Sequence, residues 1–328
     1  MSEFAMGTIC TVNLFDQGTT ELYSKVFVRL RELEDIFSVF SEDSDLYQVN
    51  QNAGLEPVKV RRELIEVLSI ALKYAEKSGG AFDPTIGPLI RLWDIGDIGQ
   101  RYSQHDSRRD GPRVPSEEAI RQALNLVNYR DVEINHTEQT VFLTRPGMAL
   151  DLGAIAKGFA ADEIVRLLER EGLKRAIIDL GGDIFAFGAR EDGNNWRIGI
   201  QDPGNYRGDY FGILEVNNKS VVTSGVYERY FMEDDRLYHH ILSIESGFPV
   251  DNGLLSVTVI AEKAIDADAI STTSFTLGWE RGLELIAQIP GAAGIFLSDD
   301  LTLRLSEGLE EYFTITADEI SLEQGIEE

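Results

Sequence analysis

Two hydrophobic patterns near the beginning of the chain predict one strand followed by two helices. The apolar run at 8–15 (TICTVNLF) has the length of a strand, and from 19 to 38 apolar residues recur every three or four positions. That spacing lines one face of a helix. A second helix is predicted over 61–78, where a similar pattern ends at Gly79-Gly80, a glycine stop signal.

The middle of the chain loses this periodicity. The stretch 94–115 is polar, contains several glycines and has no regular apolar spacing, which predicts a long mobile loop. Ser116 then stands at the position of a helix cap, for a helix that runs to about 127. Short strands are predicted near 131–135 and 140–144.

Strand-like segments dominate the remainder, interrupted by two helices. A helix is predicted over 157–171, ending at Gly172, and another over 264–277. A buried strand is predicted at 175–180. The other segments that read as strands are DIFAFG, WRIGIQ, YFGILEV, SVVTSG, RLYHHIL and LLSVTVIA.

The chain closes with the segments GIFLS and LTLRLS, which Asp299-Asp300 would join into a hairpin. The order of elements predicts an α+β fold rather than a regular alternation of strands and helices. We expect a single unit over 1–316 that could consist of two subdomains and that contains a mobile loop near 94–115. The acidic residues 317–328 are expected to form a frayed tail.

Charge excludes two classes of partner. The chain has 56 acidic and 30 basic residues, for a formal net charge of −26. A nucleic-acid backbone and an anionic lipid surface both need basic residues, so neither is an expected partner. An acidic surface is compatible with a hard divalent cation. The single cysteine, Cys10, cannot form an internal disulfide and is read as a small buried apolar residue rather than a reactive thiol.

No apolar run in the sequence reaches the length of a transmembrane helix, and MSEFAMGT has no signal-peptide pattern. As the sequence stands it predicts a cytoplasmic protein. A protein that is exported or membrane-anchored is predicted instead if a signal segment was trimmed before Met1.

The stretch 151–162 (DLGAIAKGFAAD) places chemistry at the beginning of a helix. Glycines before a helix expose N–H groups at the positive end of its dipole, which favours a phosphate, and Lys157 adds a positive charge there. Asp151 would repel a phosphate unless a metal ion or a hydroxyl group lies between them. An ordinary strand–turn–helix junction with a solvated lysine explains the stretch equally well.

A second candidate lies in the helix predicted over 264–277. Asp268 and Thr272 are four residues apart and therefore share a face. A carboxylate and a hydroxyl are hard oxygen ligands, which suit magnesium together with substrate phosphates and water. The competing interpretation is a helix start in which an aspartate caps and a threonine bonds back to the main chain.

The pair His239-His240 lies on a predicted strand, so the two rings project to opposite faces. One ring is expected to be exposed and idle, while the other points inward and could act as a general base beside a phosphate. A purely structural histidine is the other interpretation. Residues 223–231 (TSGVYERYF) could line a pocket or form a tyrosine-rich hairpin. No spacing of cysteine and histidine indicates zinc.

Together these segments resemble one family, the FAD:protein FMN transferases (the ApbE family). The matching segments occur in the family's order and span nearly the whole chain. They are AMGT at 5–8, FSVFSEDSDLYQVN at 37–50, GGAFDPTIGPLIRLW at 79–93, DLGAIAKGFAAD at 151–162, DLGGDIFAFG at 179–188, TSGVYERYF at 223–231, HHILSIESGFPVDNGLLSVTVIA at 239–261 and ADAISTTSFTLG at 267–278.

The resemblance implies an ApbE-like (T-fold-like) arrangement of antiparallel sheets and packed helices, with FAD in a central cleft. It also implies that the protein binds FAD and Mg²⁺, cleaves the pyrophosphate with release of AMP, and attaches FMN through its phosphate to a threonine of an acceptor flavoprotein. In matching positions, magnesium would be held by Asp268, Thr272 and the carbonyl oxygen of Ala154, and His240 would be the base. The residues implied to contact FAD or its neighbourhood are Met6, Phe40, Ala81, Phe82, Asp83, Asp151, Lys157 and Ile241.

Some positions depart from the family's pattern. Phe40 stands where a tyrosine is common, which removes a hydroxyl group from the flavin end. Ser243-Ile244 stands where many relatives have Asp-Pro, and Val226 where the residue is often acidic. Two other functions stay open beside the transfer: hydrolysis of FAD to FMN and AMP in the same site, and binding of FAD without turnover.

Overall fold

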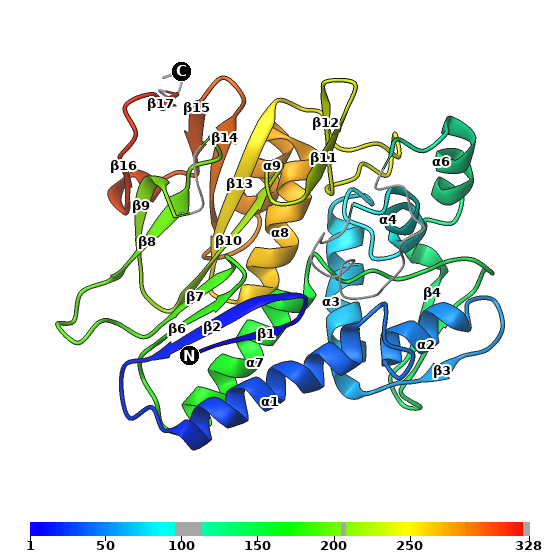
Figure 1. Cartoon of the computed structure of the whole chain (residues 1–328), viewed down its shortest axis with the longest axis horizontal. Coiled ribbons are helices and arrows are strands. Elements are labelled where there is room, and N and C mark those ends of the chain that lie inside the picture. The colour runs from blue at the N-terminus through cyan, green and yellow to red at the C-terminus, as the bar shows by residue number, and fades with distance from the viewer. Residues whose placement is uncertain (96–112, 205–207, 324–328) are drawn as a thin grey trace.

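The computed structural model describes residues 1–95, 113–204 and 208–323, and a nine-stranded sheet is its largest element (Figure 1). Neighbouring strands in the sheet are antiparallel, except for the parallel last pair, β15 and β17. In spatial order the strands are β1 (Ser2–Ala5), β2 (Thr8–Leu14), β6 (Ala176–Leu180), β7 (Ile184–Phe187), β10 (Lys219–Gly225), β13 (Leu254–Ala261), β14 (Ala293–Ser298), β15 (Thr302–Leu305) and β17 (Ser321–Leu322).

Helices cover one face of this sheet. The helix α8 packs on β10 and β13, α7 packs on β6 and on α8, and α9 packs on β14. The helices of this layer are α1 (Thr20–Phe37), α3 (Arg62–Lys77), α7 (Ala156–Arg170), α8 (Ala264–Leu277) and α9 (Trp279–Ala287). Because α8 lies in the middle, residues on all its sides are buried, including Ile265, Asp268 and Phe275.

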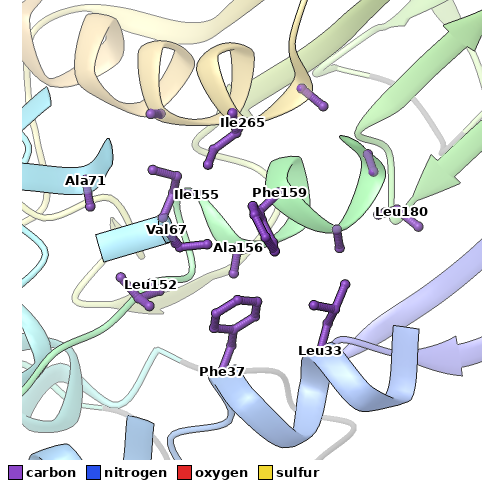
Figure 2. Packing of buried hydrophobic residues seen from close by; sticks show 14 of the residues in the cluster. Leu33, Phe37, Val67, Ala71, Leu152, Ile155, Ala156, Phe159, Leu180 and Ile265 are labelled. Carbon is purple, nitrogen blue, oxygen red and sulfur yellow. The ribbon is translucent and has the colours of Figure 1, made fainter. Parts of the chain in front are cut away.

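The main hydrophobic core fills the space between α1, α3, α7, α8 and the sheet. Phe37 at the end of α1 packs edge-on against Phe159 of α7, with ring centroids 5.8 Å apart (Figure 2). Figure 2 also shows Ile265 of α8 on the opposite side of α7. The start of α7 is therefore held between two other helices.

A small sheet covers the other face. It consists of β8 (Trp196–Gln201), β9 (Tyr210–Val216) and β16 (Phe313–Ile315). Successive residues of a strand point to opposite faces. In β10, accordingly, Val222 belongs to the core with the helices, and Val221 belongs to a second core with the small sheet.

The remaining elements form the side of the molecule next to α3. They are a three-stranded sheet of β3 (Val58–Lys59), β5 (Thr140–Leu143) and β4 (Val132–Asn135), the helices α2 (Asp45–Gln51), α4 (Gly87–Trp93) and α6 (Glu117–Leu124), the hairpin of β11 (Tyr230–Glu233) and β12 (Arg236–His239), and the 3-10 turn η1 (Tyr129–Asp131). A second 3-10 turn, η2 (Leu309–Glu311), precedes β16 and packs with the small sheet. The buried ring of Trp93 stacks on Tyr238 at 5.7 Å and fixes the β11–β12 hairpin to α4.

The predicted helices and strands are confirmed with small shifts at their ends, as is the α+β class. The helix predicted to about 127 ends earlier, at Leu124, although Ser116 caps it as expected. The predicted frayed tail is wrong for 317–323, because β17 pairs with β15 and Glu323 forms an ion pair with Arg304. Most of the predicted loop at 94–115 lies outside the described residues.

Several short elements were not predicted, among them β1, α2, α4 and α9. Each is too short to show a full hydrophobic period, or directly follows another helix, as α9 follows α8. In the described parts of the chain, no helix combines the length and the apolar composition that crossing a bilayer requires.

Candidate active site

The helices α7 and α8 approach each other too closely at Gly158 for any larger residue. A β-carbon built on Gly158 would lie 2.3 Å from the carbonyl oxygen of Ala264 and 2.7 Å from the Cα of Ile265. Only a glycine fits such a contact. The second glycine of DLGAIAKGFAAD therefore brings the N-terminal ends of two helices into backbone contact.

Two carboxylates cross the interface between these helices in opposite directions. Asp268 on α8 accepts the N–H of Gly158 on α7 through Oδ2, at 2.8 Å. Asp162 on α7 accepts the N–H groups of Ala264 and Ile265 on α8, at 2.8 and 3.1 Å. Neither helix is capped by the side chain of its own N-cap residue, so each N-terminus is satisfied by a carboxylate of the other helix.

Asp268 is placed where a cation would be favourable. Its side chain is buried, and desolvation raises the pKa of its carboxyl group, while the charge of Lys157 and the hydrogen bond from Gly158 lower it. A buried carboxylate needs a positive partner to stay ionised at low cost. Because Oδ2 holds Gly158, Oδ1 is the oxygen that can serve a metal ion.

The carbonyl of Ala154 lies four residues before Gly158 in the chain, just ahead of α7. In a helix that began one turn earlier, the N–H of Gly158 would bond to this carbonyl, four residues back. Here the N–H of Gly158 bonds to Asp268 instead. Asp268 therefore takes the donor that a helix begun one turn earlier would have given to Ala154.

Thr272 completes the predicted ligand set. It lies four residues after Asp268 on α8, partly open to solvent, and its Oγ1 is 3.1 Å from the Oγ of Ser224 on β10. Over 1–95, 113–204 and 208–323, no group of three or more His, Cys, Asp or Glu residues could hold a metal ion. A site of one carboxylate, one hydroxyl and one carbonyl is of another kind, and suits Mg²⁺ that keeps water and substrate phosphate.

Lys157 has a partner that the sequence analysis did not include. Its Nζ forms an ion pair with Asp183, a buried residue in the turn between β6 and β7. The adjacent Gly181 lies against Thr8, since a β-carbon on Gly181 would be 2.3 Å from the Oγ1 of Thr8. Met6 lies in the turn between β1 and β2 that precedes Thr8.

The segment Ala81–Asp83 adjoins Asp151 through the main chain. The N–H of Asp151 donates to the carbonyl of Pro84 at 2.8 Å. Asp83 is buried and accepts three hydrogen bonds, from the N–H and the hydroxyl of Thr85 and from the N–H of Tyr129. Asp83 thus holds the loop together, and any contact of Ala81 or Phe82 with FAD depends on the shape of that loop.

Asp151 and His240 share a charged neighbour. Desolvation raises the pKa of Asp151, which its hydrogen bond from the N–H of Gly153 and the charges of Arg229 and Arg91 oppose. Desolvation, with the charges of Arg229 and Lys157 acting in the same direction, lowers the pKa of His240 to about 3. The guanidinium of Arg229 therefore lies close enough to act on both residues.

The two adjacent histidines differ in burial, as their strand position predicts. The more buried ring, however, is not the one that could act as a base. His239 is buried, its Nδ1 accepts the N–H of Ile241, and its Nε2 donates to the carbonyl of Val250 at 2.9 Å. His240 is half-buried, and its Nδ1 lies 3.2 Å from the carbonyl oxygen of Arg229. A proton on that Nδ1 leaves the lone pair of Nε2 free to accept another.

Apart from Met6 and residues 81–83, the predicted residues fall into three groups. Asp151, Ala154, Lys157, Asp268 and Thr272 lie around the crossing of α7 and α8, and His240 is within reach of the charge of Lys157. Ile241 is buried, and its N–H donates to the Nδ1 of His239, so its contact with FAD stays a prediction. Phe40 is 70% exposed in the segment after α1, and nothing in the described residues covers its ring.

Three residues of this region were missed. They are Asp162, which caps α8, Asp183, which holds Lys157, and Arg229, which faces Asp151 and His240. Asp162 follows a predicted helix start, and Asp183 follows a Gly-Gly turn. Their partners, Ala264 and Lys157, are more than twenty residues away along the chain, and such local features do not predict contacts at that separation.

A hollow of about 560 Å³ lies elsewhere, between α1, α3 and α7. It is lined by charged side chains such as Arg29, Glu63 and Glu163, which pair with one another. It contains none of the predicted site residues, so its size does not make it the substrate site.

Comparison with known proteins identifies similar proteins over nearly the whole chain. The model of the ApbE family matches residues 6–296. The FAD:protein FMN transferase of Treponema pallidum (strain Nichols) is 38% identical over 325 residues, which cover 94% of this chain and 86% of that protein.

Two solved structures share the fold. The ApbE protein of Thermotoga maritima matches with a TM-score of 0.82 and 31% identity, covering 95% of this chain and 98% of that one. The flavin transferase ApbE of Vibrio cholerae matches with a TM-score of 0.81 and 27% identity, over 95% of this chain and 98% of that one. The predicted ApbE-like arrangement of antiparallel sheets and packed helices is confirmed.

Proposed function

This chain belongs to the ApbE family, and we propose that it is a magnesium-dependent FAD:protein FMN transferase. The proposed reaction cleaves the pyrophosphate of FAD, joins FMN through its phosphate to a threonine of an acceptor flavoprotein, and releases AMP. The name of the Treponema pallidum relative supports the transfer of FMN from FAD to protein. The hydrogen bond between Gly158 and Asp268 supports the site, because it fixes the carboxylate of Asp268 at the start of α7, close in sequence to Ala154.

A bound magnesium ion would withdraw charge from the pyrophosphate and stabilise AMP as the leaving group. Asp268, Thr272 and the carbonyl of Ala154 would hold it. The chain's own residues supply the remaining steps. His240 accepts the proton of the threonine hydroxyl at Nε2, the threonine oxygen bonds to the phosphorus of FMN, and the bond from that phosphorus to the AMP oxygen breaks.

The low pKa of His240 fits this role in one respect and limits it in another. The ring is neutral at any pH well above 3, so it is ready to accept a proton. A base of so low a pKa is weak, but the negative pyrophosphate would raise the pKa of His240 when FAD is bound. The hydrogen bond to the Arg229 carbonyl keeps the accepting nitrogen on the opposite side of the ring.

The test is a transfer assay with purified chain, FAD, Mg²⁺ and an acceptor protein that contains a candidate threonine. We expect a fluorescent acceptor, heavier by one FMN, in an amount matched by AMP. Asp268→Asn and His240→Gln should each reduce the rate by at least about 10²-fold, as expected for a lost metal ligand or base. Glu169→Gln, at an exposed position of α7, is the matched control and should transfer normally.

Two results would contradict the proposal. Free FMN and AMP without labelled acceptor, for every acceptor offered, would make the chain an FAD pyrophosphatase. Tight FAD binding with no AMP in the presence of Mg²⁺ would make it a binding protein without turnover.

A further inference from the structure

Three hydroxyl groups form a chain beside the candidate metal ligands. The Oγ of Ser224, on β10, lies 2.9 Å from the Oγ of Ser271 and 3.1 Å from the Oγ1 of Thr272, both on α8. Ser271 in turn donates to the main-chain carbonyl of Asp268 at 2.9 Å. The chain therefore begins at the residue that carries the candidate carboxylate and ends at the candidate hydroxyl ligand.

The direction of the protons along this chain follows from its first link. A carbonyl oxygen can only accept, so the single proton of Ser271 is committed to Asp268. In the contact between Ser271 and Ser224, Ser224 must then be the donor. The single proton of Ser224 is used there, so in the last contact Thr272 donates to Ser224.

This direction matters for a metal ligand. A hydroxyl group binds a cation through a lone pair, and its proton must point elsewhere. With its proton directed to Ser224, Thr272 keeps both lone pairs of Oγ1 for the side of the site. If the proton were free to rotate, part of the population would present it to the cation.

The backbone holds Ser224 firmly in this position. Its strand, β10, is paired on one side with β13, where Ser224 lies opposite Val257. The neighbouring Thr223 forms a hydrogen bond of 2.8 Å with the hydroxyl of Thr258 across the same pair of strands. Because α8 packs on both strands, the distance from Ser224 to Thr272 is set by the main packing of the fold.

We propose that Ser224 is a positioning residue that fixes the hydroxyl of Thr272, through a one-way chain of hydrogen bonds from Asp268, so that its lone pairs face a divalent cation. The inference rests on the proposed function, because it takes Asp268 and Thr272 as the ligands of that cation. Ser224 itself does not touch the cation in this arrangement. Its effect should therefore disappear when Thr272 is absent.

The test measures metal binding directly. Mn²⁺ is titrated into the whole chain, with and without FAD, and free Mn²⁺ is followed by electron paramagnetic resonance. Ser224→Ala should weaken Mn²⁺ binding by about tenfold, the lower end of what residues behind metal ligands contribute. Ser220→Ala is the matched control, since Ser220 is a buried serine of the same strand that bonds to the carbonyl of Ile184 away from the site, and its affinity should stay at the wild-type value.

A double-mutant cycle separates positioning from a general loss of structure. Thr272→Ala should weaken Mn²⁺ binding, and adding Ser224→Ala to it should cause no further loss. Equal, additive losses in the two backgrounds would overturn the inference, as would wild-type affinity in Ser224→Ala. If Thr272→Ala and Asp268→Asn both keep wild-type affinity, the proposed metal site is wrong, and the role of Ser224 falls with it.

Discussion

Asp162 and Asp268 bind the N-terminal ends of each other's helices, yet only one of them has a role in the proposed chemistry. Asp268 has an oxygen to offer to a cation, whereas both oxygens of Asp162 are used by N–H groups of α8. Burial raises the pKa of Asp162 to about 6, against the effect of these two hydrogen bonds. The ionised carboxylate of Asp162 therefore lowers the stability of the folded protein, by an amount that depends on pH.

Replacing Asp162 should change how the stability of the protein depends on pH. An acid with a raised pKa in the folded state binds its proton more tightly when folded, so the free energy of unfolding falls as the pH rises from about 4 to about 6. A rise in pKa of this size corresponds to roughly 3 kcal/mol. Asp162→Asn cannot ionise, so its stability deficit relative to wild type should shrink between pH 4.5 and pH 7.5. Urea unfolding at both values measures this, and a deficit that is constant or grows with pH would contradict it.

His240 should remain neutral through the usual range of histidine titration. Because desolvation and the charge of Arg229 lower its pKa to about 3, its ring resonances should not move between pH 8 and pH 5. NMR of the free protein tests this, with His240→Gln used for assignment. A titration midpoint near 6.5 would mean that the ring is solvated and that its surroundings differ from those described.

At the scale of single residues, sequence pattern predicts a contact when both partners share one element. Asp268 and Thr272 are four positions apart on a helix, and their common face follows from helical geometry. The ion pair of Lys157 with Asp183 and the bond of Ser224 with Thr272 join different elements. No local rule connects such positions, because the packing of the whole sheet decides which turn and which strand meet.

Among the elements, the crossing of α7 and α8 decides whether a site exists. The two helices touch through main-chain atoms at Gly158, and two carboxylates hold them together in opposite directions. The long helices α1 and α3 were predictable because a full hydrophobic period fits within each of them. The crossing of α7 and α8 was not, because Gly158 shows from sequence alone only that the chain needs a small residue.

Gly158→Ala should therefore damage both stability and metal binding. The added β-carbon would lie 2.3 Å from the carbonyl oxygen of Ala264, which is main chain and cannot rotate away. Pushing the helices apart should cost at least about 1–3 kcal/mol, as overpacking does, and should break the bond from Gly158 to Asp268. Thermal unfolding and Mn²⁺ titration measure the two effects.

The control for this substitution is Glu169→Ala, at an exposed position near the end of the same helix. It should leave both measurements close to wild type. Wild-type Mn²⁺ affinity in Gly158→Ala would show that the metal, if bound, does not depend on the crossing of α7 and α8.

The whole molecule brings together segments from both ends of the chain around one crossing. Met6 comes from the first hairpin, Asp151 and Lys157 from the middle, and Asp268 from α8, so under the proposed function FAD binding would depend on all three parts. A ligand that binds only the folded state stabilises it by about 2.7 kcal/mol at one hundred times its dissociation constant. Binding of FAD should therefore change the temperature at which the whole chain unfolds.

FAD with Mg²⁺ should raise the midpoint of thermal unfolding by a few degrees, about 3–6 °C for a chain of this size. Removing the metal with EDTA should reverse the part of the rise that depends on Mg²⁺. In Asp268→Asn, FAD alone should act as in wild type, and added Mg²⁺ should have no further effect. A rise with Mg²⁺ in this variant would place the metal elsewhere.

In α7 and α8, each N-terminal end is bound by a carboxylate of the other helix, and this arrangement also limits how the protein can change over evolution. Gly158, Asp162, Ala264 and Asp268 form one interlocked unit, because each position is in contact with another on the opposite helix. A lineage that enlarged the residue at 158 would have to withdraw α8, and would lose the oxygen ligands as it did so. We expect descendants that keep the fold but carry a bulky side chain there to have abandoned the reaction, so this one position could sort active relatives from inactive ones.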